Sequence, residues 1–432
     1  MPACPALLIA GPASGQGKTT VTAGLARLHR ERGRKVRVFK TGPDFLDPMI
    51  LERASGAPVQ SLDLWMVGED GCSRLLAEAA EQADLILIEG VMGLFDGTPS
   101  SADLAARFGV PVAAVISAQA MAQTFGALAF GLAHYRPDVS IYGVLANHVG
   151  SERHARMLEE SVPKDIRWLG HLCRSDRIKL PERHLGLHQA GEIIELDARI
   201  DLTAKSIADT ALAELPPPVF FEPQAPLALP KSLDGMRIAM ARDAAFSFIF
   251  PANVGLLETL GAHVAYFSPL ADEPVPDGTD ALFLPGGYPE LHAPTLAAST
   301  VSAASIRAHA AAGKPILAEC GGMLYLLDSL TDAAGVQTPM LGLLPGHATM
   351  HERLRGLGMQ ALNSKYGVMT GHTFHYSSMA TDLVPERHTY RPQSDAAGEP
   401  MFREASIVAT YMHGYWPSNP ALAAALFKGS AF

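Results

Sequence analysis

Residues 11–20 read GPASGQGKTT and contain the glycines, lysine and threonine of a phosphate-binding loop. Glycines let the backbone curl until successive N–H groups point at phosphate oxygens, and the helix that follows adds the positive end of its dipole. In such a loop the lysine reaches the terminal phosphates and the threonine hydroxyl holds Mg²⁺. We therefore predict a nucleotide site formed by Gly15, Gln16, Gly17, Lys18, Thr19 and Thr20.

The local context of this loop fits, although its spacing is unusual. Residues 6–10 are an apolar run typical of a buried strand, and residues 21–30 read as a helix. Pro12 stands where a phosphate loop usually has its first glycine, and Gly11 lies one position earlier. The sequence therefore predicts a phosphate loop that is one residue longer than usual.

Acidic residues follow two further predicted strands. The strand at residues 36–40 leads to Asp44 and Asp47, which neighbouring prolines would hold on a short rigid loop. The apolar run at residues 83–88 ends at Glu89. Ligands of open α/β sheets bind beyond the carboxyl ends of the strands, where an acid is a natural Mg²⁺ ligand. We predict a metal site of Thr19, Asp44 and Glu89; a solvated turn is the alternative for the two aspartates.

A second set of reactive residues lies near the carboxyl end of the chain. Cys320 follows a short apolar run and precedes two glycines and a helix-like stretch, as in a turn that displays a nucleophile. We expect the helix N-terminus to lower the pKa of the Cys320 thiol. His413 ends another predicted strand at residues 407–413, and Gly287 and Gly321 could offer backbone N–H groups to an oxyanion. A cysteine assisted by a histidine can release ammonia from an amide; a structural cysteine is the alternative.

These residues need a scaffold of strands that alternate with helices. Apolar runs typical of buried strands recur along the chain, and a helix is expected at residues 123–134. The further strands are expected at residues 112–116, 141–146, 237–241, 264–267, 281–284 and 315–319. Alternation of this kind predicts the α/β class with two doubly wound domains, each built on a parallel sheet.

Length and composition set limits on the type of protein. A chain of 432 residues with 48% hydrophobic and 18% charged residues predicts two or three well-packed domains. A formal net charge of −10 argues against general attraction to nucleic acid or acidic membranes. The four cysteines are widely spaced, and neither a signal peptide nor a membrane-spanning run is apparent. We therefore expect a cytoplasmic protein with no nucleic-acid or membrane partner.

Proline density marks the expected boundary between the domains. Residues 215–230 contain many prolines and show no periodicity, which is typical of an extended, semi-rigid linker. We predict a first domain at residues 1–215, a proline-rich linker at residues 216–234 and a second domain at residues 235–432.

The motifs resemble known families. The ECGGM turn at residues 319–323, the PGG loop at residues 285–287 and His413 resemble a class I glutamine amidotransferase domain. The phosphate loop, with its extra residue, resembles the dethiobiotin synthetase-like ATP-binding fold. Together with further stretches, the whole chain resembles the cobyrinate or hydrogenobyrinate a,c-diamide synthase family. Those stretches are FKTGPDFLDP at residues 39–48, EGVMGLFDG at 89–97, ARDAAFSF at 241–248 and GHTFHYS at 371–377.

The resemblance implies a glutamine-hydrolysing ligase of cobalamin biosynthesis. Its partners would be ATP with Mg²⁺, L-glutamine and hydrogenobyrinate or cobyrinate, whose a and c carboxylates would become carboxamides through acyl phosphates; a homodimer stays open. Cys320 would be the nucleophile, and His413 would raise its nucleophilicity. We assign the substrate to a region that contains Phe45, Leu46, Asp47 and Asp96.

The sequence also departs from related families in ways that bear on the alternatives. Most class I domains carry a glutamate two residues after the histidine, where this chain has Tyr415, so the group that orients His413 is unassigned. CTP synthase has that glutamate, and partitioning ATPases carry a second lysine where this chain has Pro12 and Ala13. Cobyric acid synthase, which amidates four other side chains, is the nearest alternative, and nickel-sirohydrochlorin a,c-diamide synthase is another that is close by its motifs. Whether the macrocycle carries cobalt, nickel or no metal stays open.

Overall fold

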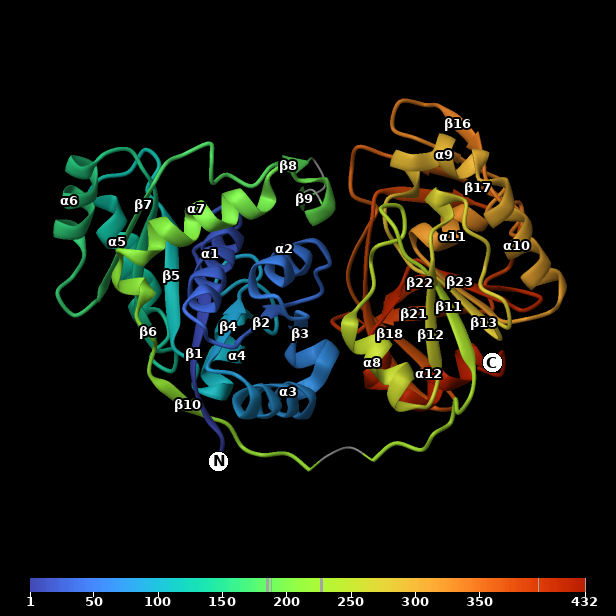
Figure 1. Ribbon diagram of the computed structural model, residues 1–432, viewed down its shortest axis with the longest axis horizontal. Helices are drawn as coiled ribbons and strands as arrows, with labels where there is room; N and C mark the ends of the chain where they lie inside the picture. The colour runs from blue at the N-terminus through green and yellow to red at the C-terminus, as the bar shows by residue number, and fades with distance from the viewer. Residues whose placement is uncertain (184–185, 188, 226–227, 395, 432) are drawn as a thin grey trace. The chain divides into compact units, whose positions relative to one another are not determined.

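The computed structural model describes residues 1–183, 186–187, 189–225, 228–394 and 396–431. The chain forms two compact units, Met1–Pro226 and Leu227–Phe432, and each is described by itself. Both units combine helices with a large sheet, as predicted for the α/β class (Figure 1). No helix in the described part of the chain is both long enough and apolar enough to cross a membrane.

The first unit is built on a twisted parallel sheet of seven strands with one antiparallel addition. The order is β3-β2-β4-β1-β5-β6-β7, and β10 pairs antiparallel with the start of β1. The sheet strands are β1 (Ala3–Ala10), β2 (Val36–Thr41), β3 (Gln60–Leu62), β4 (Leu85–Glu89), β5 (Val112–Ser117), β6 (Ile141–Val149), β7 (Trp168–Cys173) and β10 (Pro218–Phe220). A separate pair comprises β8 (Glu182–Arg183) and β9 (Gly186–Leu187).

Helices cover both faces of this sheet because its central strands are apolar on both sides. In β1, Leu7 and Ile9 pack with the helices of one face, and Ala6 and Leu8 pack with those of the other. One face carries α1 (Lys18–Glu31), α2 (Leu46–Ser55) and α7 (Leu196–Ala208). The other carries α3 (Glu69–Gln82), α4 (Ser101–Phe108), α5 (Thr124–His134) and α6 (Glu152–Ser161).

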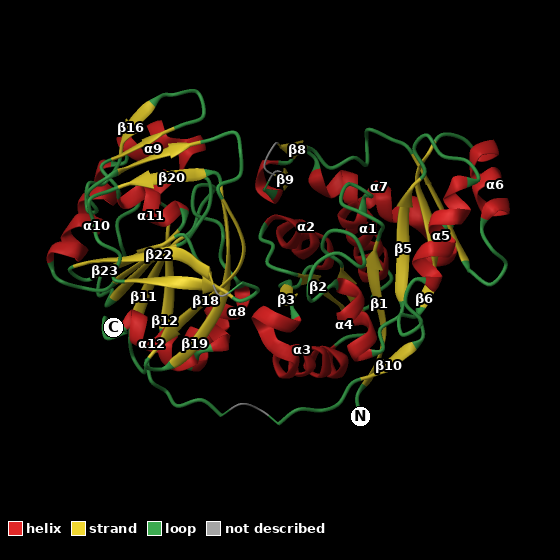
Figure 2. Cartoon of the chain, turned by 180° about the vertical axis from the view of Figure 1, so that it is seen from behind, coloured by secondary structure: helices red, strands yellow, loops and turns green. Residues whose placement is uncertain are grey.

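The second unit contains a ten-stranded mixed sheet and a smaller sheet of four strands (Figure 2). Five parallel strands form the part predicted from the sequence: β12 (His263–Phe267), β11 (Arg237–Ala241), β13 (Ala281–Leu284), β14 (Ile316–Glu319) and β23 (Ile407–Thr410). An antiparallel extension continues with β22 (Ala396–Glu404), β21 (Arg387–Arg391), β18 (Gly356–Ser364), β19 (Gly367–His375) and β24 (His413–Gly414). The small sheet comprises β16 (Gln337–Pro339), β15 (Ser329–Thr331), β17 (His347–Met350) and β20 (Ser377–Ala380).

Helices also cover both faces of the larger sheet in this unit. Its two apolar cores meet α8 (Pro251–Thr259) and α12 (Pro420–Phe427) on one face. On the other face they meet α9 (Ala293–Ala298), α10 (Thr300–Ala311) and α11 (Gly321–Leu326). The doubly wound arrangement is therefore present in both units, and the antiparallel strands are an addition that the sequence did not reveal.

Three local expectations need correction or comment. Leu46 and Asp47 lie in the first turn of α2, not in a loop, because Asp44 Oδ1 accepts hydrogen bonds from the backbone N–H groups of both (2.9 and 3.3 Å). The strand expected to end at His413 ends at Thr410, and His413 belongs to β24, which pairs with β19. Within the predicted linker, β10 is a strand of the first unit, and residues 226–227 lie outside the described residues.

Candidate functional site

The predicted phosphate loop joins β1 to α1, as its residue pattern indicates. Lys18 begins α1, and its Nζ donates hydrogen bonds to the carbonyl oxygens of Ala13 (2.9 Å) and Met92 (2.7 Å). The ammonium group thus lies between the phosphate loop and the glycine-rich loop after β4. Burial, followed by the nearby charge of Lys40, lowers the pKa of Lys18. Thr20 lies in the same first turn of α1.

The side chain of Asn147 fixes the curled part of the loop from β6. Asn147 Nδ2 donates to the Gln16 carbonyl oxygen at 2.9 Å, and the Ser117 backbone N–H donates to Gln16 Oε1 at 2.8 Å. Gly17 has a φ of 86°, and a Cβ on it would lie 2.2 Å from Asn147 Nδ2. Only glycine therefore fits between this strand and the turn.

Glu89 and Lys40 form the charged centre of the first unit. The Thr19 hydroxyl donates to Glu89 Oε1 at 2.7 Å, which joins two of the predicted metal-binding residues. Lys40 Nζ, at the end of β2, lies 2.9 Å from Glu89 Oε1, 2.6 Å from Asp47 Oδ2 and 3.8 Å from Asp44 Oδ2. The predicted acids therefore converge, and they converge on a lysine that sequence reasoning did not assign to the site.

Burial and charge pairing set the protonation of this cluster. Burial raises the pKa of Glu89 to about 7, and burial together with the charge of Asp47 raises the pKa of Asp44 to about 7. Although burial opposes both shifts, the ion pair raises the pKa of Lys40 and lowers that of Asp47. Lys40 is thus held as a cation with Asp47 as its charged partner.

Glu89 also has the unsatisfied atom that a metal site needs. Its Oε2 is buried, and it accepts no hydrogen bond from the described residues. A Mg²⁺ ion or its water could satisfy this oxygen, with the Thr19 hydroxyl beside it, so these residues fit the predicted metal. Another group of metal-ligating side chains in the described part of the chain comprises Glu152, His171 and Cys173, at α6 and β7, away from the phosphate loop.

The residues assigned to substrate lie on two segments next to this cluster. Phe45 precedes α2, whose first turn contains Leu46 and Asp47, and Asp47 is tied to Lys40. Asp96 Oδ2 accepts a hydrogen bond from the Gly93 backbone N–H at 2.9 Å, within the loop whose Met92 carbonyl binds Lys18. Both segments are therefore close to groups that would handle the phosphates.

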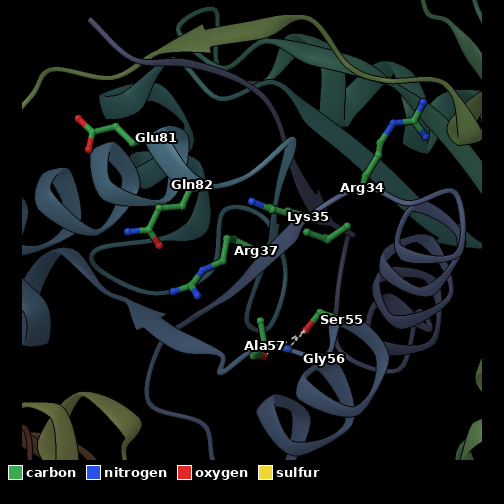
Figure 3. Close-up of a pocket in the computed structure, with 9 residues that line it drawn as sticks. Arg34, Lys35, Arg37, Ser55, Gly56, Ala57, Glu81 and Gln82 are labelled. Atoms are coloured by element: carbon green, nitrogen blue, oxygen red, sulfur yellow. Dashed lines mark hydrogen bonds between the residues drawn. The ribbon is translucent and has the colours of Figure 1, made fainter.

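A pocket in the first unit lies at the opposite end of β2 from these residues. It has a volume of about 620 Å³ and is bounded by the start of β2 and the carboxyl ends of α2 and α3 (Figure 3). Its lining residues are Arg34, Lys35, Val36, Arg37, Ser55, Gly56, Ala57, Glu81 and Gln82. It contains none of the predicted site residues.

In the second unit, Cys320 lies on the sharp turn between β14 and α11. Its φ of 44° and ψ of −108° are strained for a side-chain-bearing residue, and its backbone N–H donates to the Thr410 carbonyl oxygen at 2.8 Å. The expected lowering of the thiol pKa is wrong: burial, followed by the charge of Glu290, raises the pKa of Cys320 to about 12. A helix of six residues and the Gly321 backbone do not offset the loss of water.

His413 lies in the same buried region. Its ring is stacked on that of His372 with centroids 5.0 Å apart, and a Cβ on Gly286 would lie 2.4 Å from its Cε1. Burial lowers the pKa of His372 to about 3, and burial together with the charges of His372 and His375 lowers the pKa of His413. His413 is therefore held as a neutral imidazole, which can accept a proton.

The two predicted oxyanion donors come together beside Cys320. A Cβ on Gly321 would lie 3.0 Å from the Gly287 backbone nitrogen. The loop that contains Gly287 follows β13, the neighbour of β14 in the sheet. The two predicted donors therefore lie close together, and Gly321 directly follows Cys320 in the chain.

Glu319 is a further buried acid at this site. Its Oε1 accepts a hydrogen bond from the Gly414 backbone N–H at 3.2 Å, and its Oε2 lies 3.9 Å from His413 Nδ1. Burial raises the pKa of Glu319 to about 8, although contacts with Gly414 and Trp416 oppose that shift.

Comparisons with known proteins match both units of the chain. The nucleotide binding domain of the CobQ/CobB/MinD/ParA family matches residues 7–187, and the CobB/CobQ-like glutamine amidotransferase domain matches residues 237–421. A hydrogenobyrinate a,c-diamide synthase of Pseudomonas aeruginosa is 59% identical over 98% of this chain and 97% of its own length. The chain belongs to the cobyrinate and hydrogenobyrinate a,c-diamide synthase family.

Two further relatives support this membership. A hydrogenobyrinate a,c-diamide synthase of Stutzerimonas stutzeri is 58% identical over 98% of this chain and 99% of its own length. A cobyrinate a,c-diamide synthase of Herminiimonas arsenicoxydans is 49% identical over 98% of this chain and 96% of its own length. The family resemblance predicted from the motifs is therefore confirmed along nearly the whole chain.

In this member of the a,c-diamide synthase family, sequence reasoning missed Lys40, Asn147 as a support of the loop, and Glu319. Glu319 ends the apolar strand β14 just as Glu89 ends β4, and that shared pattern was a usable signal. Lys40 lies one residue before the end of the buried strand β2, where an unpaired cation would be costly, so a partner acid could have been inferred. Asn147 gave no comparable signal, because a polar residue near a strand end is common.

Proposed function

We propose that this chain is an ATP- and glutamine-dependent amidoligase that converts the a and c carboxylates of hydrogenobyrinate or cobyrinate into carboxamides. The observation that carries the proposal is that one chain holds both a phosphate loop and a cysteine turn and is 59% identical, over nearly its full length, to a relative named as a hydrogenobyrinate a,c-diamide synthase. We assign activation of the carboxylate to residues 1–215 and release of ammonia to residues 235–432, joined by residues 216–234.

Activation begins with transfer of the γ-phosphoryl group of ATP to a macrocycle carboxylate, which gives an acyl phosphate and ADP. The phosphoryl group is highly charged, so cations that surround it lower the barrier. Lys18 and Lys40 supply two such cations from the phosphate loop and from β2. Thr19, Glu89 and Asp44 would hold Mg²⁺, which would supply further positive charge against the phosphates when bound.

Ammonia for the second step comes from glutamine. Cys320 Sγ attacks the side-chain amide carbon of glutamine and gives up its proton to His413, and Gly287 and Gly321 donate to the oxyanion. Collapse of this intermediate returns the proton to the departing ammonia and leaves a thioester, which water hydrolyses to glutamate. The ammonia, as neutral NH₃, then attacks the acyl phosphate and releases phosphate with a new amide.

The macrocycle is assigned to the segments that carry Phe45, Leu46, Asp47 and Asp96. Leu46 and Phe45 offer apolar surface for a corrin, and Asp96 shapes the loop that also contacts Lys18. Since the first unit has one phosphate loop, the two carboxylates must be amidated in turn. We favour the metal-free macrocycle, because the two more similar relatives are named for hydrogenobyrinate.

The direct test supplies the purified protein with ATP, Mg²⁺, glutamine and one macrocycle at a time. The panel contains hydrogenobyrinate, cobyrinate, their a,c-diamides and nickel-sirohydrochlorin, and mass spectrometry counts the amides formed. We expect two amides on hydrogenobyrinate and none on either a,c-diamide. Amidation of an a,c-diamide would instead indicate a cobyric acid synthase. Preference for nickel-sirohydrochlorin would indicate a nickel-sirohydrochlorin a,c-diamide synthase.

Two variants separate the two half-reactions. Cys320→Ala should lose glutamine-dependent amidation and keep the reaction that is driven by ammonium salts. Lys18→Ala should lose both, because no acyl phosphate forms. If Cys320→Ala used glutamine at the wild-type rate, or Lys18→Ala amidated normally with ammonia, the assignment of that site would be wrong.

A further inference from the structure

The buried carboxyl group of Glu319 lies beside the ring of His413 and accepts a hydrogen bond from the backbone of the next residue, Gly414. Glu319 Oε1 accepts the Gly414 N–H at 3.2 Å, and Glu319 Oε2 lies 3.9 Å from His413 Nδ1. The two side chains are only 6% and 2% exposed. Because Gly414 directly follows His413, one carboxyl group is anchored to the same short strand whose imidazole it faces.

The other neighbours of His413 restrict the plane of its ring. His372 is stacked on it at 5.0 Å with an interplanar angle of 20°, Phe248 approaches at 6.1 Å, and Gly286 lies against Cε1. Stacking of this kind sets the ring plane but does not select which ring nitrogen carries the proton. A carboxyl group that faces Nδ1 can make that selection.

Tyr415 occupies the position where class I amidotransferase domains usually carry their glutamate. Its ring is buried and packs edge-on against Phe250, with centroids 5.9 Å apart. Glu319, which directly precedes Cys320 in sequence, reaches the histidine from β14 instead. The acid is thus supplied by a different element, next to the nucleophile.

We infer that Glu319 is the positioning residue of His413. In its ionised form the carboxylate accepts a hydrogen bond from Nδ1–H, so that Nε2 is free of a proton and can accept the one from Cys320 Sγ. The present 3.9 Å separation exceeds a direct hydrogen bond by about 1 Å, and such contacts often shorten when substrate fills a site. The inference rests on the proposed function only in that Cys320 attacks glutamine.

A glutamine-like chloroketone provides a test that needs no macrocycle. In this reaction Cys320 Sγ displaces chloride from the methylene carbon, a C–S bond forms, and the thiol proton passes to His413. Mass spectrometry of the intact chain gives the rate at saturating reagent and, separately, the reagent concentration for half-maximal rate. Loss of histidine positioning should lower the rate at saturating reagent and leave the half-saturating concentration nearly unchanged.

We expect Glu319→Gln to reduce the saturating rate of alkylation and the glutamine-dependent kcat by about 10²-fold, within the range that general-base assistance contributes. The half-saturating concentrations and the ammonia-dependent amidation should change by less than about threefold. Glu319→Asp, which keeps the carboxyl group on a shorter chain, should recover part of the lost rate. It also keeps the test decisive if the glutamine variant folds poorly.

Glu399→Gln is the matched control, because it removes another buried acid of the same unit, one that pairs with His375 instead of His413. The charge of Glu399 raises the pKa of Cys320, so its removal should not slow the reaction of the thiol. The inference is wrong if Glu319→Gln alkylates within threefold of wild type, if Glu399→Gln loses as much rate, or if ammonia-dependent amidation falls in parallel. Failure of the wild-type chain to amidate any macrocycle would count against the proposed function alone, since the alkylation rates would still report on Glu319.

Discussion

The two sites use the same kind of strand ending in opposite electrostatic settings. In each unit a central parallel strand ends in a buried glutamate, Glu89 in β4 and Glu319 in β14. Glu89 lies 2.9 Å from the Lys40 ammonium, whereas Glu319 faces the neutral ring of His413. Burial raises the pKa of both acids, to about 7 and about 8. The difference between the sites thus comes from the partner of the glutamate.

That difference matches the chemistry proposed for each site. Phosphoryl transfer moves a highly charged group, and fixed cations such as Lys18 and Lys40 stabilise it. Acyl transfer from glutamine starts from neutral groups, and its product ammonia must stay unprotonated to remain a nucleophile. A site in which burial keeps Cys320, His372 and His413 neutral is consistent with the second task. The charged cluster therefore depends on its ion pairs with Lys40, whereas the neutral site depends on the exclusion of water.

The largest effect is expected when the cation of the first site is removed. Lys40→Met would remove the ammonium group that pairs with Glu89, Asp47 and Asp44. Breaking a buried ion pair on one side typically costs about 3–5 kcal/mol of the free energy of unfolding. We expect such a loss at pH 8 by urea denaturation, together with loss of amidation from ammonia and ATP.

The pH dependence of this loss follows from the protonation of the acids. Their charged forms need Lys40, so the difference between Lys40→Met and wild type should shrink as the pH falls and the carboxylates become protonated. Lys40→Arg is the control, because it keeps the charge and should lose less stability. A deficit that is below 1 kcal/mol, or that grows toward acid pH, would show that Lys40 does not hold this cluster together.

The sequence predicted those features of the two sites that neighbouring residues specify. It did not predict the features that depend on residues far apart in the chain. The strand, glycine loop and helix around Lys18 were predictable because each is specified by neighbouring residues. The turn that places Asp47 in α2 depends on a hydrogen bond from the Asp47 backbone N–H to Asp44 Oδ1, and the neighbouring prolines conceal this signal. The Lys40–Glu89 pair joins residues far apart in the chain, and only the parallel pairing of β2 with β4 brings them together.

The same reasoning explains the error at Cys320. The sequence shows a helix after the cysteine, which would lower the pKa of the thiol, but it does not show how completely the fold removes water. Desolvation acts through every element packed around the turn, and here it dominates. Local signals therefore identified which residues react, and the three-dimensional packing determined their resting protonation.

A second prediction concerns the tight contact that shapes the phosphate loop. Gly17→Ala would place a methyl group 2.2 Å from Asn147 Nδ2 at a φ of 86°, so the curl of the loop must open. We expect nucleotide affinity, measured by calorimetry, to fall by about 10²-fold, as misplaced binding groups can cost. Gly33→Ala is the control: its φ of 81° is similar, but a methyl group there meets no atom within 4 Å. Equal losses in the two variants would mean that backbone strain alone explains the requirement for glycine.

A third prediction tests the neutral state of the cysteine site. Because burial raises the pKa of Cys320 to about 12, its thiolate fraction should increase about tenfold for each pH unit below that value. Iodoacetamide should therefore label Cys320 slowly at pH 7, and the rate should still be rising at pH 10. The exposed Cys173 would mask this signal, so the experiment uses a Cys173→Ser background, with added Cys320→Ala as the blank. A rate that levels off below pH 8 would indicate a low-pKa thiol instead.

The smallest effect is expected at the segment assigned to the macrocycle, where the structure separates two roles. Asp47 contacts Lys40 at 2.6 Å, so Asp47→Asn should weaken the charged cluster and slow both amidations alike. Leu46 precedes it in the same turn, and no charged group contributes to its proposed role, which is to contact the corrin. Leu46→Ala should slow one amidation more than the other by a few-fold, because a repositioned macrocycle meets this apolar surface from a different side.

The measurement is a time course with mass analysis, in which Leu46→Ala accumulates more monoamide than wild type does. Monoamide build-up in Asp47→Asn but not in Leu46→Ala would reverse the two assignments, and the acid would then be the group that distinguishes the two carboxylates.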